Sequence, residues 1–325
     1  MSSYKKVCEV ISKTCLDIKK GENVVIVTDI NKQKIGNELF NYLQNITNTV
    51  MIQIPVTSKN GEEPVAIVNN IFQKADVIIA PTTMSLSHTR AFVNARKKGT
   101  RVASLPGITE NMFLQSIDVE YSAMSELTKK LADAIKGKNI IKVKTDLGTD
   151  VSFSVKGRKP ICLDGICHKK GGFINLPDGE MCIAPIENSM NGVLVFDLSS
   201  SPDHRTKWGK VGLLNNEKIK LVIKNGKIIS FSNGAKAKII KNIIDNSDKN
   251  ANCIAEFAIG TNNKARITGL ILEDEKKLGT IHFAFGSNVS IGGKNQSNLH
   301  LDMIMDKPDV YFDNVQILKK GKLLI

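Results

Sequence analysis

Short runs rich in β-branched residues alternate with longer amphipathic segments along the first 137 residues, and this alternation limits the fold more than any other feature. The runs cover residues 24–28, 49–54, 76–80 and 101–104. The segments between them, at residues 33–46, 65–74 and 86–98, have the spacing of amphipathic helices. Strands that alternate with helices join as βαβ units, so the pattern predicts a flavodoxin-like α/β domain with a parallel sheet.

The loops after these strands carry no phosphate-binding motif. Residues 81–84 follow the third run and residues 105–107 the fourth, and open α/β sheets bind ligands at such carboxyl-end loops. The chain has neither a GxGxxG pattern nor a Walker loop. Nothing in this half therefore specifies a nucleotide.

The rhythm changes after a long helix expected at residues 119–136. Short alternating segments then dominate, broken by Gly, Asn and Asp turns, with one amphipathic helix at about residues 237–245. The predicted strands cover residues 140–144, 151–155, 193–197, 219–223 and 228–231. We therefore expect two domains, an α/β domain at residues 1–138 and an α+β domain at residues 139–325.

The net charge of +13 does not indicate nucleic-acid binding. Only six of the 45 basic residues are Arg, and the Lys residues stand in ones and twos beside acidic residues. No apolar run approaches the roughly 18 residues that span a bilayer, and the first residues lack the apolar core of a signal peptide. We expect a soluble, cytoplasmic protein that binds a peptide or a small molecule, with neither nucleic acid nor membrane as a partner.

The six cysteines are scattered, which fits a reducing compartment. Cys162, Cys167 and His168 could form half of a zinc site, but no second half has suitable spacing. Ordinary thiols near a loop are the favoured interpretation.

The polar residues that could take part in catalysis or metal binding lie in four otherwise apolar or glycine-rich segments, at residues 173–185, 254–262, 271–286 and 292–302. Glu256 and His282 each stand inside an apolar run, and a buried charge must be paired, hydrogen-bonded or bound to a metal. The spacing of His300 and Asp302 places both on one face of a strand. Carboxylates and imidazoles without thiolates suit Zn²⁺, Mn²⁺, Co²⁺ or Fe²⁺.

Each of these features also has a structural interpretation. His282 could be a core histidine with its hydrogen bonds satisfied, and Glu180 could simply follow an Asp-Gly turn. Glu256 could pair with Arg266 or Lys264. Their coincidence in one domain, among several glycines, is what favours a metal site.

The order of the motifs resembles the thermophilic-type metallo-aminopeptidases, the group of aminopeptidase T, aminopeptidase S and leucyl aminopeptidase. The motifs are Pro-Asp-Gly-Glu180, Ala-Glu256-x-x-x-Gly-Thr-Asn262, Leu-Glu-Asp-Glu-Lys276-x-x-Gly-Thr-x-His282, and Gly-Gly-Lys-Asn-x-Ser297 followed by His300-x-Asp302. The resemblance implies that Glu180, Glu256, His282, His300 and Asp302 bind two divalent ions (Zn²⁺, Co²⁺ or Mn²⁺). It also implies Glu256 as bridging ligand or base, a metal-bridging water as nucleophile, and a homodimer.

The chain departs from the peptidases at one metal-site position. Where they carry a tyrosine, this chain has Val289, and it is also shorter. The same superfamily contains a shorter, ring-cleaving branch that resembles 2,5-dihydroxypyridine 5,6-dioxygenase, with one non-haem Fe²⁺ held in part by the equivalents of His300 and Asp302. That branch lacks the full glutamate set, so Glu180 and Glu256 favour the aminopeptidase. The alternatives are the dioxygenase and a metal- or ligand-binding relative without peptidase activity.

The remaining polar residues have simpler interpretations. His88, His168 and His204 are expected to be solvated or hydrogen-bonded, and Trp208 to be packed. The acidic and basic run at residues 273–277 is expected to be mostly a solvated turn. One of its carboxylates, or Arg266, could support His282 from behind.

Overall fold

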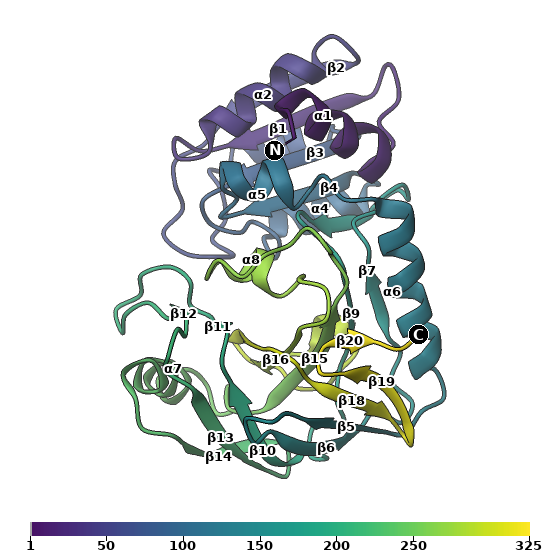
Figure 1. Cartoon of the computed structure of the whole chain (residues 1–325). Coiled ribbons are helices and arrows are strands. Elements are labelled where there is room, and N and C mark those ends of the chain that lie inside the picture. The colour runs from purple at the N-terminus through teal and green to yellow at the C-terminus, as the bar shows by residue number, and fades with distance from the viewer. Residues whose placement is uncertain (1) are drawn as a thin grey trace. The chain divides into compact units, whose positions relative to one another are not determined.

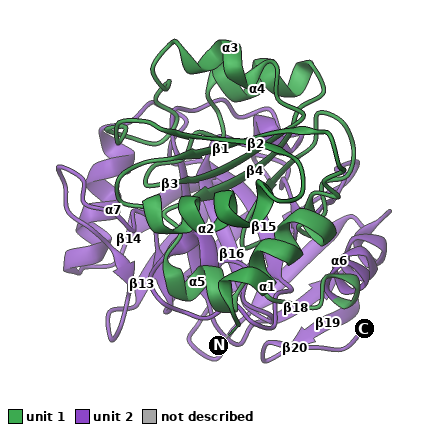
Figure 2. Ribbon diagram, turned by 90° about the horizontal axis from the view of Figure 1, so that it is seen from above, with its two compact units in different colours: residues 1–123, 164–178 green, residues 124–163, 179–325 purple. Residues whose placement is uncertain are grey.

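The computed structural model describes residues 2–325, which divide into two compact units (Figures 1 and 2). The first unit comprises residues 1–123 and 164–178, and the second comprises residues 124–163 and 179–325. The single boundary expected at residues 138 and 139 differs from this division. Helix α6 (Tyr121–Ile135) crosses from one unit to the other, and residues 164–178 return to the first.

The first unit contains a five-stranded parallel sheet in the order β2-β1-β3-β4-β8. Figure 2 shows α3 and α4 over one face of this sheet and α1, α2 and α5 over the other. The strands are β1 (Asn23–Thr28), β2 (Asn48–Gln53), β3 (Val77–Thr82), β4 (Arg101–Pro106) and β8 (Phe173–Asn175). The helices are α1 (Tyr4–Glu9), the π-helix η1 (Val10–Cys15), α2 (Gln33–Leu43), α3 (Val68–Phe72), α4 (Arg90–Lys97) and α5 (Glu110–Gln115).

Local capping explains why one helix is shorter than its amphipathic pattern. The pattern covers residues 86–98, but α4 begins at Arg90 because the Thr89 hydroxyl accepts the N–H of Phe92 as an N-cap. The four strands predicted for this half are confirmed within about two residues, as is usual for element ends. Strand β8 was not predicted, because its three residues come from a distant segment and have no periodicity of their own.

The second unit contains two antiparallel sheets. The eight-stranded sheet has the order β14-β13-β10-β6-β5-β18-β19-β20 and the seven-stranded sheet the order β12-β11-β17-β16-β15-β9-β7. The first comprises β5 (Ile140–Lys144), β6 (Asp150–Ser154), β10 (Asn191–Phe196), β13 (Ile219–Lys224), β14 (Lys227–Phe231), β18 (Asp309–Phe312), β19 (Val315–Lys319) and β20 (Lys322–Leu323). The second comprises β7 (Ile161–Leu163), β9 (Glu180–Ile183), β11 (Ser199–Ser200), β12 (Gly212–Leu213), β15 (Ile254–Gly260), β16 (Ile281–Gly286) and β17 (His300–Met305). Short helices complete the unit: α7 (Ala235–Asp245), α8 (Ile271–Asp274) and the 3₁₀ turn η2 (Val289–Ile291).

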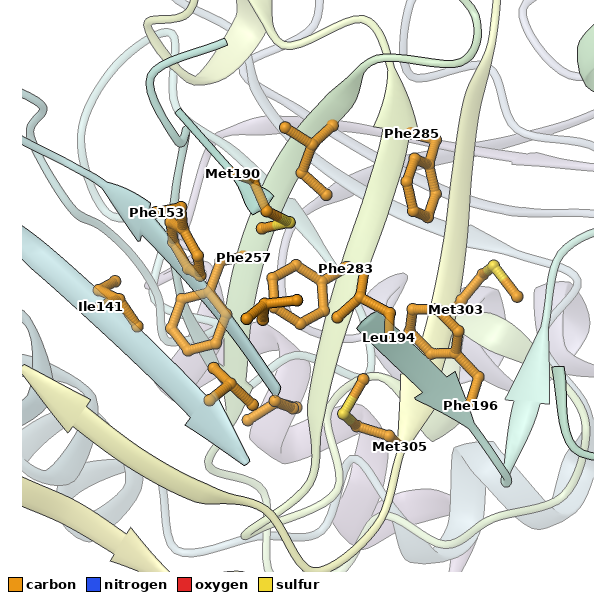
Figure 3. Close-up of a cluster of buried hydrophobic side chains, with 14 of the residues drawn as sticks. Ile141, Phe153, Met190, Leu194, Phe196, Phe257, Phe283, Phe285, Met303 and Met305 are labelled. Carbon is orange, nitrogen blue, oxygen red and sulfur yellow. The ribbon is translucent and has the colours of Figure 1, made fainter. Parts of the chain in front are cut away.

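A phenylalanine cluster joins the two sheets of this unit (Figure 3). Phe153 of β6 meets Phe257 of β15 with ring centroids 5.4 Å apart, and Phe283 of β16 meets Phe196 of β10 at 6.4 Å. All four rings are fully buried. Phe257 and Phe283 thus lie on the face of the seven-stranded sheet that packs in the core. The side chains that alternate with them along β15 and β16 must point to the other face.

The expected fold class, an α/β domain followed by a strand-rich domain, is confirmed. All six cysteines are free thiols. Among residues 2–325, no helix is both long enough and apolar enough to cross a membrane.

Candidate metal centre

The register of the seven-stranded sheet places all five predicted site residues on its non-core face. Glu256 on β15 pairs with Ala284 on β16, which in turn pairs with Asp302 on β17. Strand partners share a face, so these side chains point the same way. The same register adds the remaining residues to this face: Glu180 opposite Gly260, His282 opposite Ala258, and His300 opposite Gly286.

A β-bulge in β15 reverses which of its residues face the core and which face the site. The pairing with β16 shifts between Ile254, opposite Phe285, and Glu256, opposite Ala284. A bulge inserts one residue and so reverses the alternation of side chains. Ile254 consequently packs in the core, while Glu256 faces the site.

Small residues between the polar ones let the backbone of neighbouring segments approach this face closely. A Cβ at Gly286, where φ is +106°, would lie 2.1 Å from the carbonyl oxygen of Leu299, so the position requires glycine. A Cβ at Gly260 would lie 2.1 Å from the carbonyl oxygen of Lys277. Ala258 and Ala284 stand between the longer side chains of neighbouring strands. The glycines expected near the site therefore allow close backbone approach.

The carboxylate of Glu256 lies between two imidazoles. Its Oε2 is 3.3 Å from Nε2 of His300, and its Oε1 is 3.9 Å from Nε2 of His282. Nε2 of His300 is also 3.3 Å from Oδ1 of Asp302, and Nε2 of His282 is 3.7 Å from Oε2 of Glu180. The five residues therefore form one cluster, and Glu256 pairs with His300 rather than with Arg266 or Lys264 as considered from the sequence.

A hydrogen bond to backbone fixes the orientation of the His300 ring. Its Nδ1 lies 2.9 Å from the carbonyl oxygen of Ser287, to which an N–H at Nδ1 donates. That hydrogen bond leaves Nε2 as the ring nitrogen that faces the carboxylates. A second hydrogen bond of this kind sets the tautomer of metal-binding histidines in general.

Burial and mutual charge shift the titration of the cluster. Glu180, Glu256 and His282 are less than a tenth exposed, whereas the side chain of His300 is 40% exposed and marks the open side of the cluster. Burial disfavours the charge of Asp302, but the neighbouring His300 outweighs it and lowers the pKa of Asp302 to about 2. Burial also opposes protonation of His300, yet Asp302 and Glu256 raise its pKa well above the usual value. The cluster thus favours a positive charge at its centre.

A buried lysine belongs to the same cluster, and the sequence analysis missed it. Nζ of Lys276 lies 2.7 Å from Oε1 of Glu180 and 2.8 Å from Oε1 of Glu275, and Lys276 is only 1% exposed. The run at residues 273–277, expected to be a solvated turn, is therefore largely buried. Burial is the largest cause that raises the pKa of Glu275 well above its usual value; Glu180 and Asp302 add to the rise, and Lys276 opposes it.

The other two carboxylates of this run accept hydrogen bonds from backbone N–H groups. Asp274 accepts the N–H groups of Thr268 and Gly269 at 2.7 and 2.9 Å. Glu273 accepts the N–H of Arg266 at 3.2 Å, and the Arg266 guanidinium lies 3.9 Å from the same oxygen. The sequence had suggested that Arg266 could support His282. In the structure Arg266 pairs with Glu273 instead.

Cys182 is the second residue that the sequence did not reveal. It pairs with Ala258 and so shares the site face with Glu180 and Glu256, within 4.8 Å of ligand atoms of both. Burial raises the pKa of its thiol well above the usual value, and the nearby carboxylates add to this effect. A lone cysteine in the apolar run of β9 carries no spacing signal by which it could have been found.

The cluster fits a divalent cation. Oε2 of Glu180 and Nδ1 of His282 are buried without a hydrogen-bond partner among the described residues, which is costly unless another group satisfies them. Three overlapping groups have ligand atoms within 4.8 Å of one another: Glu180, Cys182 and Glu256; Glu256, His300 and Asp302; and Glu275, His282 and Asp302. Imidazole and carboxylate donors suit Fe²⁺, Zn²⁺, Mn²⁺ and Co²⁺.

The residues given simpler interpretations lie outside this cluster. Nε2 of His168 is 2.8 Å from the carbonyl oxygen of Thr14, and Nδ1 of His204 is 3.4 Å from Asp203, so both are hydrogen-bonded as expected. Val289, at the position of the peptidase tyrosine, lies on η2 with 54% of its surface exposed.

Comparison with solved structures defines the class of fold. The structure of 2,5-dihydroxypyridine dioxygenase from Pseudomonas putida KT2440 matches with a TM-score of 0.80 and 18% identity, covering 99% of this chain and 96% of that one. Wild-type AmpT from Thermus thermophilus matches with a TM-score of 0.73 and 14% identity, covering 99% of both chains. The chain therefore has the aminopeptidase T-like fold that the motif order indicated.

Comparison with protein families gives the narrower assignment. The family model described as 2,5-dihydroxypyridine 5,6-dioxygenase (NicX) matches residues 6–325. The chain belongs to this family. A curated 2,5-dihydroxypyridine 5,6-dioxygenase of Pseudomonas putida KT2440 is 22% identical over 265 residues, which is 78% of this chain and 72% of the relative. The expectation of an enzyme is supported, and of the two activities considered, the comparisons support the ring-cleaving alternative rather than the aminopeptidase.

Proposed function

We propose that this protein is a dioxygenase that opens the ring of 2,5-dihydroxypyridine, or of a closely similar dihydroxylated aromatic ring, with one Fe²⁺ as its metal. The observation that carries the proposal is the convergence of His300, Asp302 and Glu256 on one face of the sheet, with His282 beside them. Two imidazoles and a carboxylate with open positions are the typical ligand set of non-haem Fe²⁺ oxygenases. The family match supplies the substrate class.

Each residue of the cluster has a distinct part in this proposal. His300 and Asp302 would hold the ion from β17, and Glu256 or His282 would complete the set from the neighbouring strands. When bound, Fe²⁺ would supply redox chemistry with O₂ and a binding position for a ring hydroxyl. Glu180 and Lys276 form a buried ion pair within the cluster, whereas His300 is partly exposed.

The sheet surface itself would position the substrate. Ala258 and Ala284 carry no atoms beyond Cβ, so their own strands place no longer side chain next to Glu256 and His282. The core face beneath, with Phe257 and Phe283, keeps water out from the opposite side. A low-dielectric surrounding of this kind strengthens the interactions that orient a polar substrate.

Two assays distinguish the proposal from peptidase activity. The purified chain, loaded with Fe²⁺ without oxygen, is mixed with 2,5-dihydroxypyridine and O₂, and the loss of ring absorbance is followed together with O₂ consumption. We expect equimolar consumption of both. The same protein with Co²⁺, Mn²⁺ or Zn²⁺ should not hydrolyse aminoacyl-p-nitroanilides. Anilide hydrolysis without O₂-dependent ring loss would contradict the proposal.

A further inference from the structure

The loop between β16 and β17 is tied by one hydrogen bond to a residue of the candidate metal centre. Nδ1 of His300 donates to the carbonyl oxygen of Ser287, the first residue after β16, at 2.9 Å. Nε2 of the same ring lies 3.3 Å from the carboxylates of both Glu256 and Asp302. The ring of His300 is 40% exposed, so packing alone does not fix it. The direction of the Ser287 carbonyl therefore sets the direction of Nε2.

Asn295 holds the two peptide groups on either side of Ser287. In the peptide group before it, the Gly286 carbonyl accepts from Nδ2 of Asn295 at 2.6 Å, and the Ser287 N–H donates to the Leu299 carbonyl at 2.7 Å. In the peptide group after it, the N–H of Asn288 donates to the backbone carbonyl of Asn295 at 3.0 Å. A planar peptide group that is hydrogen-bonded through both its N–H and its C=O cannot turn without breaking a bond. The plane of the Ser287 carbonyl is therefore fixed.

Asn295 is itself held by buried partners. It is 9% exposed, and Asn288 is fully buried. The N–H of Asn295 donates to Oδ1 of Asn288 at 2.8 Å, and Nδ2 of Asn288 donates to Oε1 of Glu187 at 3.2 Å. Nδ2 of Asn295 also donates to the carbonyl oxygen of Asn250 at 3.0 Å. Buried polar groups whose hydrogen bonds are made hold a segment in a single conformation.

These contacts account for the motif Gly-Gly-Lys-Asn-x-Ser297, which the proposed metal ligands leave unexplained. A Cβ at Gly293 would lie 2.0 Å from Cγ of Asn288, so a side chain there would displace the carboxamide. The hydroxyl of Ser297 donates to Oδ2 of Asp248 at 2.8 Å and accepts the N–H of Leu299 at 3.1 Å. The motif thus keeps the loop in the shape that the contacts of Asn295 require.

We propose that Asn295 is a positioning residue for His300. By holding the Ser287 carbonyl, it keeps a ring hydrogen on Nδ1 of His300 and directs Nε2 towards Glu256 and Asp302. Groups that orient a metal-binding histidine through its other ring nitrogen affect metal affinity although they do not touch the metal. The inference deepens the proposed function, on which it rests for the presence of a metal.

The first test needs neither metal nor substrate. Metal-free protein is labelled with ¹⁵N-histidine, and the Nδ1–H signal of His300 is assigned among the five histidines by its absence from His300→Gln. We expect a signal that exchanges slowly with water in the wild type. In Asn295→Asp, which keeps the shape of asparagine and removes its N–H donors, exchange should be at least tenfold faster. The control Gln296→Glu adds the same charge at the next, exposed residue and should leave the signal unchanged.

The second test measures the affinity of the same variants for Co²⁺ by calorimetric titration. Asn295→Asp should bind Co²⁺ about tenfold more weakly than Gln296→Glu, the low end of the range for changes behind metal ligands. Because both variants carry the added charge, the difference reports the lost hydrogen bonds. Equal affinities, an unchanged Nδ1–H exchange rate in folded Asn295→Asp, or a wild type without a slowly exchanging Nδ1–H would each overturn the proposal. If Asn295→Asp does not fold, Asn295→Ala removes the same donors without a charge and is held to the same expectations.

The outcome is separable from that of the proposed function. Faster Nδ1–H exchange in Asn295→Asp, without any ring cleavage by the wild type, would leave the role of Asn295 intact and defeat the dioxygenase. Ring cleavage by the wild type, with unchanged Nδ1–H exchange in Asn295→Asp, would do the reverse.

Discussion

Oε2 of Glu256 lies 3.3 Å from Nε2 of His300, although the strands that carry them, β15 and β17, are separated by β16. The contact passes over Ala284, the β16 residue paired with Glu256 on one side and with Asp302 on the other. A larger residue at that position would stand between the ligands. The site therefore depends on a side chain that takes no part in chemistry.

Replacing Ala284 with valine should weaken metal binding more than it weakens the fold. The two added methyl groups would point among Glu256, His300 and Asp302, and we expect a loss of Co²⁺ affinity of about tenfold or more, the range seen when the surroundings of metal ligands change. Overpacking should lower the free energy of unfolding by about 1–3 kcal/mol. Calorimetric titration and urea unfolding measure the two effects. Unchanged affinity for Co²⁺ would show that the space over Ala284 is not used.

The loop between β16 and β17 is expected to be anchored by an ionised Glu187. Its Oε1 accepts the backbone N–H of Lys294 at 2.6 Å, and its Oε2 accepts from the Arg158 guanidinium at 2.6 Å. Burial opposes its charge, but the N–H of Lys294 and further hydrogen bonds outweigh this and hold its pKa below the usual value.

A depressed pKa fixes the sign of the pH dependence. The stabilisation by Glu187 should be complete above the unfolded-state pKa of about 4.3 and should be lost as the pH falls through the lower folded-state value. The melting temperatures of wild type and Glu187→Gln, measured from pH 7 to pH 3, should differ most at the high end and converge at the low end. A constant difference across this range would mean that the charge is not responsible.

The core beneath the site should be intolerant of a cavity. Phe283 contacts Phe153, Phe196 and Phe257 and is fully buried, so Phe283→Ala should lower the free energy of unfolding by about 3–5 kcal/mol. The matched control is Ile229→Ala, since Ile229 is 59% exposed and should change stability by about 0.5 kcal/mol or less. Urea unfolding followed by circular dichroism measures both. Equal effects would contradict the packing of the two sheets around Phe283.

The sequence predicted those parts of the molecule that have a local signal. The spacing of His300 and Asp302 predicted that both lie on one face of a strand, and both lie on the same face of β17. The β-branched runs likewise predicted the parallel sheet of the first unit. Neither pattern requires information from a distant segment.

The rest depends on contacts between segments far apart in the chain. A charged run such as residues 273–277 reads as solvated, because the sequence does not show that the carboxylate of Glu180, supplied by the distant strand β9, pairs with the buried Lys276. Cys182 and β8 are missed for the same reason, since strand pairing alone gives them their place. The homodimer expected from the resemblance stays a prediction.

The central claim is Fe²⁺-dependent ring cleavage at Glu256, His300 and Asp302. Its most direct test measures O₂ consumption with 2,5-dihydroxypyridine by the iron-loaded wild type and by Asp302→Asn, with bound iron determined in both. We predict about one O₂ per substrate in the wild type and loss of both iron and ring cleavage in the variant. Ring cleavage by the metal-free wild type, or by an Asp302→Asn variant at wild-type rate, would contradict the account.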